Sequence, residues 1–502
     1  MIKEKFYITT PLYYVNDEPH IGHAYTTILA DVISRIKEIQ GEQVFFLTGT
    51  DEHGQKVQEA AKKNNTSPKE HVDKYVKRFQ NTWKDIDIKY TDFIRTTDKK
   101  HTDVVKHILN DLFDRGEIYL NEYEGLYSVS EERFITQKEA DEGNFREIKK
   151  LKEKNYFFKM SKYQKELIKH INENPEFIKP ESRKNEILSF LNNDLQDLCI
   201  SRPKKRLSWG IELPFDENYV TYVWFDALIN YISAIGWNSN QEKFDSCWPA
   251  DYHLMAKDIL TTHCVYWPTM LMACGIPLPK TIFAHGWWLI DNVKMSKSIG
   301  NVVKPLDLAK QYGSDSLRYY LMRNMVLGQD ASFTYESFVE RYNSDLANDY
   351  GNLVNRILIL ISKYFDGKVP ENFNYNDVDL ELIAKAKQAP NKIIENYNNL
   401  KLHEAIDLIF ELFRNLNKYL ELKSPWKTIK DESKYEDTSS TLYISVEILR
   451  LCTVLLSPVM PKKAVELFEY LNLEIEYDYS FGYLKSGHPI SRPNNMFPKI
   501  ED

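Results

Sequence analysis

The 502-residue sequence has few cysteines, and none of them stands in a Cys-x-x-Cys pair. The five that are present are scattered along the chain: Cys199, Cys247, Cys264, Cys274 and Cys452. An odd number without local pairing is typical of reduced thiols and excludes both a disulfide framework and an evident metal site. The first residues, "MIKEKFYITT", also lack an apolar run of signal-peptide length. We therefore expect a cytoplasmic protein.

Long apolar runs and an excess of positive charge are also missing. No window reaches about 18 uncharged apolar residues, so we expect no membrane partner. Basic residues number 65 against 73 acidic ones, a formal charge of −8, so the global charge gives no support to nucleic-acid binding. It does not exclude such binding, because phosphate recognition depends on local patches. Hydrophobic residues (43%) and charged residues (27%) are present in the proportions of globular proteins.

The first fifty residues have the pattern of a strand, a helix and a second strand. Apolar strands are predicted at residues 5–14 and 43–48, and the amphipathic segment 21–39 is predicted as a helix that ends before Gly41. Such a βαβ unit belongs to a parallel sheet, which binds ligands at the carboxyl ends of its strands. The loops "NDEPHIGH" and "GTDEHG" follow these ends and are candidate site elements.

The rest of the chain predicts an insertion and a helical C-terminal part. Residues 116–205 are charged and irregular, alternating patterns return afterwards, and from about residue 335 apolar residues recur every three or four positions. We predict an α/β fold in which a Rossmann-like parallel-sheet domain is split by an inserted domain and followed by an all-α helix bundle. The predicted ranges are 1–115 and 216–290 for the two halves of the sheet domain, 116–215 for the insertion, 291–335 for a linking segment and 336–502 for the bundle.

His20 and His23 flank Gly22 at the point where the first loop becomes a helix. A helix start presents unpaired N–H groups to an anion, and a glycine lets a phosphate or ribose approach the backbone. Two imidazoles at this point can donate hydrogen bonds to phosphate oxygens while charge develops on them. The alternative is a purely structural pair of histidines at a helix start.

Lys294 and Lys297 lie in the stretch "KMSKSIG", and Lys294 is 274 residues beyond His20. The two lysines can act as mobile charges on a phosphate chain, with Ser296 as a hydroxyl donor. Taken alone, the stretch is typical of a solvated loop. Together with His20 and His23, in this order along the chain, it resembles the signature motifs of the class I aminoacyl-tRNA synthetases.

Five other stretches narrow the resemblance to the methionyl family of these synthetases, over nearly the whole chain. They are "TPLYY" (10–14), "LTGTDEHG" (47–54), "YVWFDALINY" (222–231), "AKDILTTHCVYWP" (256–268) and "GNLVNR" (351–356). The resemblance implies a ligase that activates methionine with ATP to methionyl-adenylate and pyrophosphate, and then transfers methionyl to the 3′ end of tRNA(Met). It implies ATP with Mg²⁺ as the cofactor, and methionine, ATP and tRNA(Met) as the partners.

The same resemblance implies site residues for the two small substrates. The residues implied as catalytic are His20, His23, Lys294 and Lys297, and the ATP-binding set adds Gly22, Lys257, Asp258 and Ser296. The implied methionine-binding set is Leu12, Tyr14, Asp51, Trp224, Ala227, Leu228, Tyr231, Ile259, His263 and Trp267. Within it, Asp51 and the backbone of Leu12 are implied to hold the ammonium group. Aromatic walls suit a polarizable thioether and a carboxylate suits an ammonium group, although core packing is the alternative for any single aromatic residue.

Asn352, Arg356 and Trp426 are implied to read the anticodon. Asn352 and Arg356 are one turn apart on a predicted helix, and Trp426 follows Pro425 at a break between helices. Unpaired RNA bases stack on aromatic or guanidinium planes and hydrogen-bond through their edges. The alternative is that Trp426 fills the bundle and Arg356 makes a salt bridge.

The chain departs from the family at two points. Many methionyl enzymes hold zinc through Cys-x-x-Cys pairs in the insertion, whereas Ser128 and Glu131 stand where a first pair would, and no cysteine occurs between Gly116 and Leu198. A structural zinc site of that kind needs thiolates, so we predict a metal-free knuckle without structural zinc. Its predicted packing residues are Tyr127, Phe134 and Phe157. The sequence also ends without the dimerisation domain that some members append, so we expect a monomer.

Two other function classes stay open on the sequence alone. A small-molecule nucleotidylyltransferase would share the histidine motif but would not need the helix bundle. A catalytically silent tRNA-binding protein would need the bundle but not the intact histidine and lysine motifs. Synthetases for valine, isoleucine and leucine carry a large editing insertion, for which the interval before Lys294 leaves no space.

Overall fold

The computed structural model describes residues 5–15, 18–128, 133–135, 140–141, 148–290, 293–294, 304–371, 373–474 and 476–501. The chain forms two compact units. The sheet unit comprises Met1–Pro19, Gly41–Lys84 and Lys89–His285, and the helical unit comprises His20–Gln40, Asp85–Ile88 and Gly286–Asp502. Helix α1 (Ile21–Ile39) therefore belongs to the same unit as the C-terminal part of the chain.

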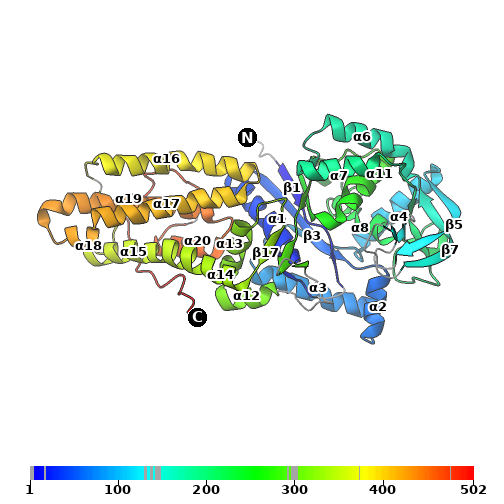
Figure 1. Ribbon diagram of the computed structural model, residues 1–502, viewed down its shortest axis with the longest axis horizontal. Coiled ribbons are helices and arrows are strands. Elements are labelled where there is room, and N and C mark those ends of the chain that lie inside the picture. The colour runs from blue at the N-terminus through cyan, green and yellow to red at the C-terminus, as the bar shows by residue number, and fades with distance from the viewer. Residues whose placement is uncertain are drawn as a thin grey trace. The chain divides into compact units, whose positions relative to one another are not determined.

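A parallel sheet is the centre of the sheet unit (Figure 1). Its strands run in the order β2-β3-β1-β13-β14-β8, β4 also pairs with β3, and these pairings are parallel. The central strands are buried along nearly their whole length, which is usual for parallel sheets. The strands are β1 (Lys5–Thr9), β2 (Tyr13–Tyr14), β3 (Gln43–Asp51), β4 (Asp92–Arg95), β8 (Ile178–Lys179), β13 (Tyr252–Ala256) and β14 (Thr281–His285).

The pairing of β1 with β3 confirms the predicted strand–helix–strand unit, with two differences in its bounds. The strand predicted at residues 5–14 ends at Thr9 and resumes as β2, because Pro11 has no N–H with which to continue the ladder. The strand predicted at 43–48 continues to Asp51. The helix predicted at 21–39 is α1, and Gly41 follows it with a φ of +87°.

Helices of the sheet unit pack with the sheet around one apolar core, whose members include Tyr7, Leu47, Leu109, Phe225 and Leu271. A 3-10 turn (Lys257–Ile259) and a π-helical turn (Thr262–Tyr266) connect β13 to α11. The helices are α2 (Gln55–Lys63), α3 (Pro68–Asp85), α4 (Lys99–Asp114), α8 (Val223–Ala227), α9 (Asn230–Ser233), α10 (Gln241–Cys247) and α11 (Trp267–Cys274). The predicted site stretches 222–231 and 256–268 are thus anchored in this core.

The stretch predicted as an insertion, 116–215, contains one small antiparallel sheet and two strands of a second, whose middle strand β12 begins just after the stretch. One has the order β6-β5-β7-β9, and the other has the order β10-β12-β11. The elements are β5 (Ile118–Ser128), β6 (Arg133–Ile135), β7 (Ile148–Phe158), α6 (Gln164–Glu173), α7 (Glu181–Leu191), β9 (Leu198–Cys199), β10 (Ser201–Pro203), β11 (Glu212–Leu213) and β12 (Asp216–Thr221). Strand β8 lies within the same stretch but pairs with β14, so the stretch contributes an edge strand to the parallel sheet. The five predicted domain ranges remain a prediction.

One of the three packing residues predicted for the knuckle is described with its side chain. Phe157 is buried, and its ring centroid lies 6.0 Å from that of Tyr119. Tyr127 and Phe134 pair through their backbones across β5 and β6, whereas their side chains lie outside the described part of the structure. Glu131 lies outside the described residues as well.

The helical unit consists mainly of α1 and the helices that follow the sheet unit in sequence. The long helices α16, α17 and α19 lie side by side (Figure 1). A three-stranded sheet of β15 (Trp288–Ile290), β16 (Val293–Lys294) and β17 (Ala331–Phe333) precedes the bundle, and a π-helical stretch (Tyr342–Gly351) joins α14 to α15. The helices are α12 (Pro305–Tyr312), α13 (Ser314–Asn324), α14 (Tyr335–Arg341), α15 (Asn352–Tyr364), α16 (Asp377–Asn398), α17 (Leu402–Lys423), α18 (Pro425–Thr428), α19 (Tyr435–Leu456) and α20 (Pro461–Tyr470).

Two helices show how the bundle buries its apolar residues. In α17 the apolar residues that recur every three or four positions are buried, at Leu402, Ile406, Ile409, Phe413, Leu416 and Leu420. By length and composition, the stretch Glu432–Leu456 would also be apolar enough to cross a membrane, and its apolar window is entirely buried inside the protein. Its composition is therefore explained by its place as the core helix of the bundle.

Candidate active site

The two histidines predicted as catalytic cap the N-terminus of α1. The backbone N–H of Gly22 donates to Nδ1 of His20 at 3.1 Å, and the backbone N–H of His20 donates to Nδ1 of His23 at 3.3 Å. Because both Nδ1 atoms accept, the proton of each neutral ring is on Nε2. The rings stack with their centroids 3.7 Å apart. The capping therefore assigns two Nε2–H donors to the start of a 19-residue helix, where the helix dipole favours an anion.

Gly22 has a structural role that was not predicted. A Cβ atom built on it would lie 2.9 Å from Cε1 and 3.1 Å from Nδ1 of His20. A side chain at position 22 would therefore collide with the imidazole that folds back over the helix start. The glycine permits the orientation of His20, and its predicted contact with ATP remains a prediction.

The predicted lysine motif lies mostly outside the described residues. Lys294 ends β16, where its backbone pairs with Leu289 of β15, and its side chain is not among the described ones. Ser296 and Lys297 also lie outside the described residues. In the sheet unit, Lys257 is half-buried and Asp258 is exposed in the 3-10 turn after β13.

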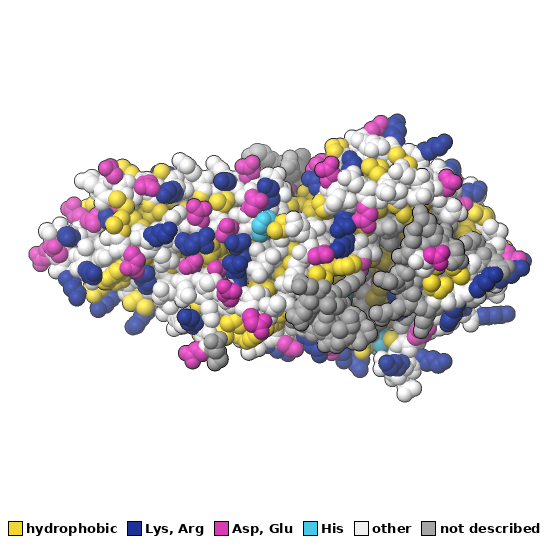
Figure 2. Space-filling view, viewed as in Figure 1, with side chains coloured by type: hydrophobic (Ala, Val, Ile, Leu, Met, Phe, Trp, Pro, Cys, Tyr) yellow, Lys and Arg dark blue, Asp and Glu magenta, His cyan; other side chains and the backbone are white. Residues whose placement is uncertain are grey.

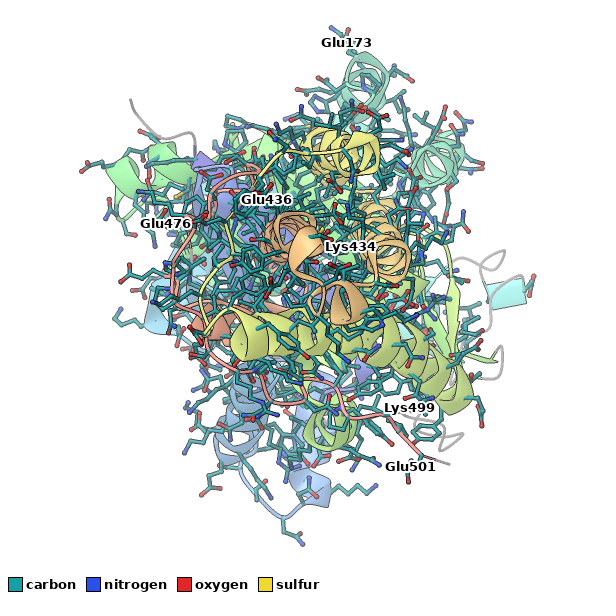
Figure 3. The ribbon with its side chains drawn as sticks, turned by 90° about the vertical axis from the view of Figure 1, so that its left-hand side faces the viewer. Glu173, Lys434, Glu436, Glu476, Lys499 and Glu501 are labelled. Carbon is teal, nitrogen blue, oxygen red and sulfur yellow. The ribbon has the colours of Figure 1, made fainter. Side chains whose placement is uncertain are left out.

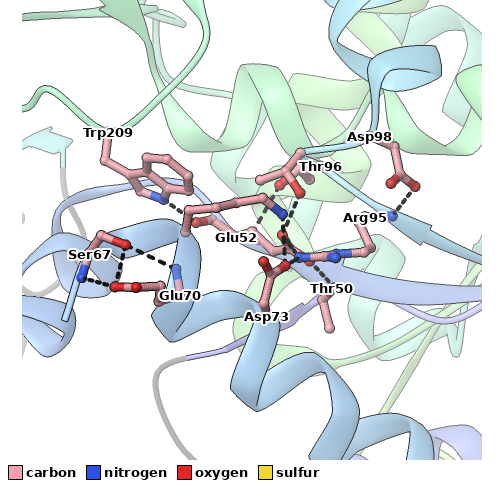
Figure 4. A network of polar contacts seen from close by, with 11 residues as sticks. Thr50, Glu52, Ser67, Glu70, Asp73, Arg95, Thr96, Asp98 and Trp209 are labelled. Atoms are coloured by element: carbon pink, nitrogen blue, oxygen red, sulfur yellow. Dashed lines mark hydrogen bonds and ion pairs between the residues drawn. The ribbon is translucent and has the colours of Figure 1, made fainter. Parts of the chain in front are cut away.

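Asp51, predicted to bind an ammonium group, is the last residue of β3 and is 2% exposed. Tyr14 of β2 pairs with it in the sheet, and the backbone N–H of Val15 donates to its carbonyl oxygen at 3.4 Å. The next residue, Glu52, is fully buried and is held by Arg95 (Figure 4). Nε and Nη2 of Arg95 donate to the two carboxylate oxygens of Glu52 at 2.6 and 2.8 Å. This fork fixes the chain immediately after Asp51.

Further groups bind Glu52 from other elements. Thr50 and Thr97 donate their hydroxyl groups to its carboxylate at 2.7 and 2.6 Å. The backbone N–H of Glu52 donates to Oγ1 of Thr96 at 2.9 Å, and the carbonyl oxygen of Glu52 accepts from the indole N–H of Trp209 at 2.5 Å (Figure 4). Glu52 is thus bound at its side chain, its N–H and its carbonyl. The chain is therefore rigidly held where the loop after β3 begins, next to Asp51.

Four residues of the predicted methionine-binding set form an aromatic cluster, Trp224, Tyr231, His263 and Trp267. The ring centroid of Tyr231 lies 5.8 Å from that of Trp267 and 5.9 Å from that of His263. Trp224 meets His263 edge to face at 6.1 Å. Other members of the set share the surroundings of this cluster: Leu228 belongs to the same core, Leu12, Tyr14 and Ile259 pack against that core partly buried, and Ala227 is buried on α8. The structure thus brings most of the predicted set to one core.

His263 is held as a neutral imidazole. Its Nδ1 lies 3.0 Å from the carbonyl oxygen of Ile259, which can only accept, so Nδ1 carries the proton. Its Nε2 lies 2.8 Å from the hydroxyl oxygen of Tyr231 and accepts from that hydroxyl. Burial lowers the pKa of His263 to about 4. The aromatic cluster therefore carries no charge at neutral pH.

His253 adjoins the aromatic cluster and was not predicted. Its Nε2 accepts from the indole N–H of Trp267 at 3.2 Å, and its Nδ1 lies 2.7 Å from Oγ1 of Thr9. Its ring centroid lies 4.2 Å from that of Tyr231, and burial lowers the pKa of His253 well below its ordinary value. A single histidine in a strand pattern gives no sequence signal of such contacts.

In the helical unit, two of the residues predicted to read an anticodon form a cation–π pair. Cζ of Arg356 lies 4.9 Å from the ring centroid of Trp426, and Nη2 of Arg356 donates to the carboxylate of Glu421 at 2.7 Å. Trp426 is half-buried, and Asn352, one turn before Arg356 on α15, is exposed. The salt bridge considered as an alternative is therefore present, but Trp426 does not fill the bundle.

Two family models match the chain. The model described as "tRNA synthetases class I (M)" matches residues 6–143 and 142–358, and the model described as "Anticodon binding domain of methionyl tRNA ligase" matches residues 369–502. With the parallel sheet, the histidines that open α1 and the helical bundle, these matches define a class I aminoacyl-tRNA synthetase.

Curated relatives and solved structures narrow this class. The chain is 46% identical to the methionine–tRNA ligase of Clostridium tetani, over all of this chain and 79% of that relative. It is 44% identical to that of Caldanaerobacter subterraneus subsp. tengcongensis, over all of this chain and 80% of that relative. Among solved structures, the Mycobacterium tuberculosis methionyl-tRNA synthetase in complex with methionyl-adenylate matches with a TM-score of 0.94 and 38% identity, over 99% of this chain and 100% of that one. The apo form of that enzyme matches with a TM-score of 0.88 and 35% identity, over 100% of this chain and 99% of that one.

The chain belongs to the methionine–tRNA ligase family. The predicted family, fold class and ligase function are confirmed. The roles of the individual site residues remain predictions. The proposal that follows argues them from the geometry described above.

Proposed function

We propose that His20 and His23 stabilise the first step of methionine–tRNA ligation. In this step the methionine carboxylate attacks the α-phosphorus of ATP and pyrophosphate leaves, so negative charge develops on phosphate oxygens. Preorganised donors act most strongly where charge develops. The observation that carries this proposal is the pair of Nδ1 hydrogen bonds that places both ring protons on Nε2 at the start of α1.

Further residues complete the proposed contacts with ATP. Lys294 and Lys297 act as mobile positive charges on the phosphate chain, as the predicted motif implies. The rest of the proposed set is Gly22, Lys257, Asp258 and Ser296. In the second step a terminal ribose hydroxyl of tRNA(Met) attacks the carbonyl carbon of methionyl-adenylate and AMP leaves, so no side chain is needed as a covalent nucleophile.

Mg²⁺ accompanies ATP in this proposal. No group of three or more His, Cys, Asp or Glu side chains within the described ranges could hold a metal ion. This fits a Mg²⁺ that takes most of its ligands from phosphates and waters, as is usual in nucleotide sites. When bound, the ion neutralises phosphate charge, and the chain's own residues position the substrates.

Methionine is proposed to bind through its two ends. Asp51 and the backbone of Leu12 hold the ammonium group, and the aromatic cluster contacts the side chain together with Tyr14, Ala227, Leu228 and Ile259. The rigid loop at Asp51 and the uncharged His263 support this assignment. A thioether gains ~0.3–1.5 kcal/mol from a contact with an aromatic ring, so an aromatic wall favours methionine over a purely aliphatic side chain.

The anticodon is proposed to bind at Asn352, Arg356 and Trp426. The guanidinium of Arg356 already lies over the indole ring of Trp426, and a base that stacks on such a plane contributes ~1–3 kcal/mol. On the face of the bundle shown in Figure 2, basic and acidic side chains are interspersed. Recognition through particular side chains, rather than through a broad basic surface, is consistent with this distribution.

The proposal also includes the cellular location and the oligomeric state. We expect a cytoplasmic monomer without a membrane partner, in agreement with five cysteines that are all free. The chain mass is 59.2 kDa, so light scattering at micromolar concentration should give about one chain mass. A dimer mass would contradict the monomer without touching the ligase function.

The central experiment is exchange of labelled pyrophosphate into ATP, run separately with each of the common amino acids. We expect exchange with methionine alone. Exchange with another amino acid would overturn the assignment of the methionine-binding set, and exchange without any amino acid would favour a nucleotidylyltransferase. No exchange at all, in a protein that still binds tRNA(Met), would favour a catalytically silent tRNA-binding protein.

Replacement of Trp426 by alanine tests the anticodon assignment. We expect Trp426→Ala to leave pyrophosphate exchange unchanged and to lower kcat/KM for tRNA(Met) charging by roughly 10-fold or more, because one stacked base is lost. Tyr435→Ala is the matched control, since Tyr435 is an aromatic residue of the same bundle and is 47% exposed. Equal losses in both assays for Trp426→Ala would mean that Trp426 only supports folding.

A further inference from the structure

A buried carboxylate between two histidines lies in the sheet unit, outside the residues assigned so far. Asp226 on α8 is fully buried, its Oδ2 lies 2.7 Å from Nδ1 of His53, and its Oδ1 lies 2.7 Å from Nε2 of His101. Nδ1 of His101 lies 2.9 Å from the hydroxyl oxygen of Ser233 on α9. Each oxygen of the carboxylate therefore has one imidazole partner.

The carboxylate of Asp226 is ionised. Burial alone would raise the pKa of Asp226, but the two imidazoles outweigh it and hold the pKa below its ordinary value. A carboxylate can only accept, so Nδ1 of His53 and Nε2 of His101 donate to it. Such charge-assisted hydrogen bonds are shorter and stronger than neutral ones, and they resist displacement in a buried place.

The two ends of one of these bonds lie next to the two proposed subsites for methionine. His53 follows Asp51 by two residues, and Glu52 between them is clamped by Arg95. Asp226 stands on α8 between Trp224 and Ala227, which are proposed to contact the methionine side chain. The bond from His53 to Asp226 thus joins the loop of the ammonium subsite to the helix of the side-chain subsite.

We propose that the His53–Asp226 bond is a positioning contact that fixes the distance between the ammonium and side-chain subsites. The proposal rests on the proposed function, because it needs methionine to bind at Asp51 and at the aromatic cluster. A ligand that fills both subsites gains from their fixed spacing, since neither has to move for the other to be occupied. A ligand that fills only one subsite gains nothing from it.

The two bonds of the Asp226 carboxylate differ in what they connect. His101 comes from α4, which carries no residue of the proposed methionine-binding set. Its bond to Asp226 stabilises α8 against the core, whereas the bond from His53 connects two groups of ligand contacts. His53 and Asp226 are accordingly positioning residues, and neither is proposed to touch methionine.

The test compares two ligands on the full chain. One is methionine, and the other is 4-(methylsulfanyl)butanoate, which is methionine without its amino group. The dissociation constant of each is measured by calorimetry with the wild type and with Asp226→Asn. We expect the preference for methionine, expressed as the ratio of the two constants, to fall about 10-fold in Asp226→Asn, as is typical of coupled sites. The ratio does not depend on the fraction of folded protein, so lost stability alone would not change it.

Two variants of His53 keep the test decisive where Asp226→Asn folds poorly. His53→Leu removes the donor and should lower the ratio in the same way. His53→Asn keeps an N–H donor near the position of Nδ1 and should retain most of the wild-type ratio. Tyr156→Phe is the control for a lost side-chain hydrogen bond elsewhere in the sheet unit, because Tyr156 donates to Asp216 at 3.0 Å in a part-buried place.

The outcomes separate this inference from the function on which it rests. Folded Asp226→Asn and His53→Leu proteins that keep the wild-type ratio would overturn the positioning role and leave a structural one. A wild-type protein without preference for methionine over the analogue would overturn the proposed ammonium subsite itself. A ratio that falls equally in Tyr156→Phe would also overturn the inference, since the effect would then not be specific to the His53–Asp226 bond.

Discussion

At the scale of single residues, Gly22 separates stability from activity. A Cβ atom at this position would meet the imidazole of His20 at 2.9 Å, although the backbone of Gly22 is not in the left-handed region. Alanine is therefore compatible with the helix backbone and, by helix propensity, gains up to about 1 kcal/mol over glycine inside a helix. Only the imidazole of His20, whose Nδ1 accepts from the N–H of Gly22, is in the way of the added methyl group.

We expect Gly22→Ala to lower kcat of pyrophosphate exchange by roughly 10-fold or more, because a displaced donor no longer meets the charge that develops on phosphate. The melting temperature should stay the same or rise. Ala24→Gly in the same helix is the mirror control, with a lower melting temperature and retained exchange. A fully active Gly22→Ala enzyme would mean that the orientation of His20 does not matter for catalysis.

His263 gives the sheet unit a pH dependence. Its pKa is about 4 in the folded protein because of burial, and about 6.5 in an unfolded chain. The unfolded state therefore binds a proton first as the pH falls, so the stability from neutral His263 is fully present above about pH 6.5 and is lost towards pH 4. Between pH 7 and pH 5 the loss attributable to this residue is about 2 kcal/mol.

The measurement is the free energy of unfolding in urea at pH 7 and pH 5, for the wild type and for His263→Gln. We expect the wild type to lose about 2 kcal/mol more than the variant over this range. His253 is also lowered in pKa, mainly by its burial, and both proteins retain that burial. Equal losses in the two proteins would show that His263 is already protonated or exposed in the folded state.

The chemistry-bearing residues of the site could be predicted where a motif fixes their spacing. His20, Gly22 and His23 are such residues, since they fall within four consecutive residues at one helix start. His253 and Asp226 could not be predicted in the same way. Each is a single polar residue in an apolar stretch, and its partners come from strands and helices that are distant in sequence. Only the fold identifies such contacts.

At the scale of elements, α19 connects two parts of the helical unit. Figure 3 views the bundle from the end that carries Lys434 and Glu436, where α19 begins beside α18 and Trp426. With 22 residues the helix is about 33 Å long. At its other end, the carbonyl oxygens of Pro458 and Val459 accept hydrogen bonds from Arg318 of α13.

The same guanidinium of Arg318 also binds α1, the helix that His20 and His23 cap. Nη2 of Arg318 donates to the carboxylate of Asp31 on α1 at 2.6 Å, and neither side chain is exposed. Arg35 donates to the same carboxylate at 2.7 Å. Arg318 therefore joins α13, the end of α19 and α1 through one fully buried group.

We expect Arg318→Lys to lower the free energy of unfolding by roughly 3 kcal/mol or more, because an ammonium group cannot reproduce the planar fork and leaves buried acceptors unpaired. Arg323→Lys is the matched control on the same helix. Its partner Asp407 is half exposed, so this variant should lose less than about 1 kcal/mol. Urea denaturation measures both, and equal losses would contradict the special role of the buried group.

Elements with strong periodicity were predictable, and short or irregular ones were not. The bounds of α1 follow from its amphipathic pattern and from Gly41 after it. Strand β8 has only two residues and no pattern of its own, and it exists because β14 offers it a free edge. The π-helical stretch between α14 and α15 keeps a helix-like pattern, so periodicity does not distinguish it from an α-helix.

At the scale of the whole molecule, the predicted absence of structural zinc remains to be tested. Ser128 is buried in β5 at the position of a family cysteine, and Glu131 lies outside the described residues. We expect dialysis against EDTA, followed by renewed Mg²⁺, to leave both the melting temperature and pyrophosphate exchange unchanged. Stoichiometric zinc in elemental analysis of the purified protein would contradict the metal-free knuckle.

The helical unit combines α1 with segments that are synthesised much later, which sets the order in which its contacts can form during synthesis. Helix α1 buries thirteen of its residues in the finished protein, yet Arg318 leaves the ribosome 287 residues after Asp31. At 5–20 residues per second this interval lasts roughly 15–60 s. For that time Asp31, a fully buried carboxylate in the finished protein, lacks its partner from α13. The contact between α13 and α1 can therefore form only after residue 318 has been made, and a chain that stops earlier leaves Asp31 without the guanidinium of Arg318.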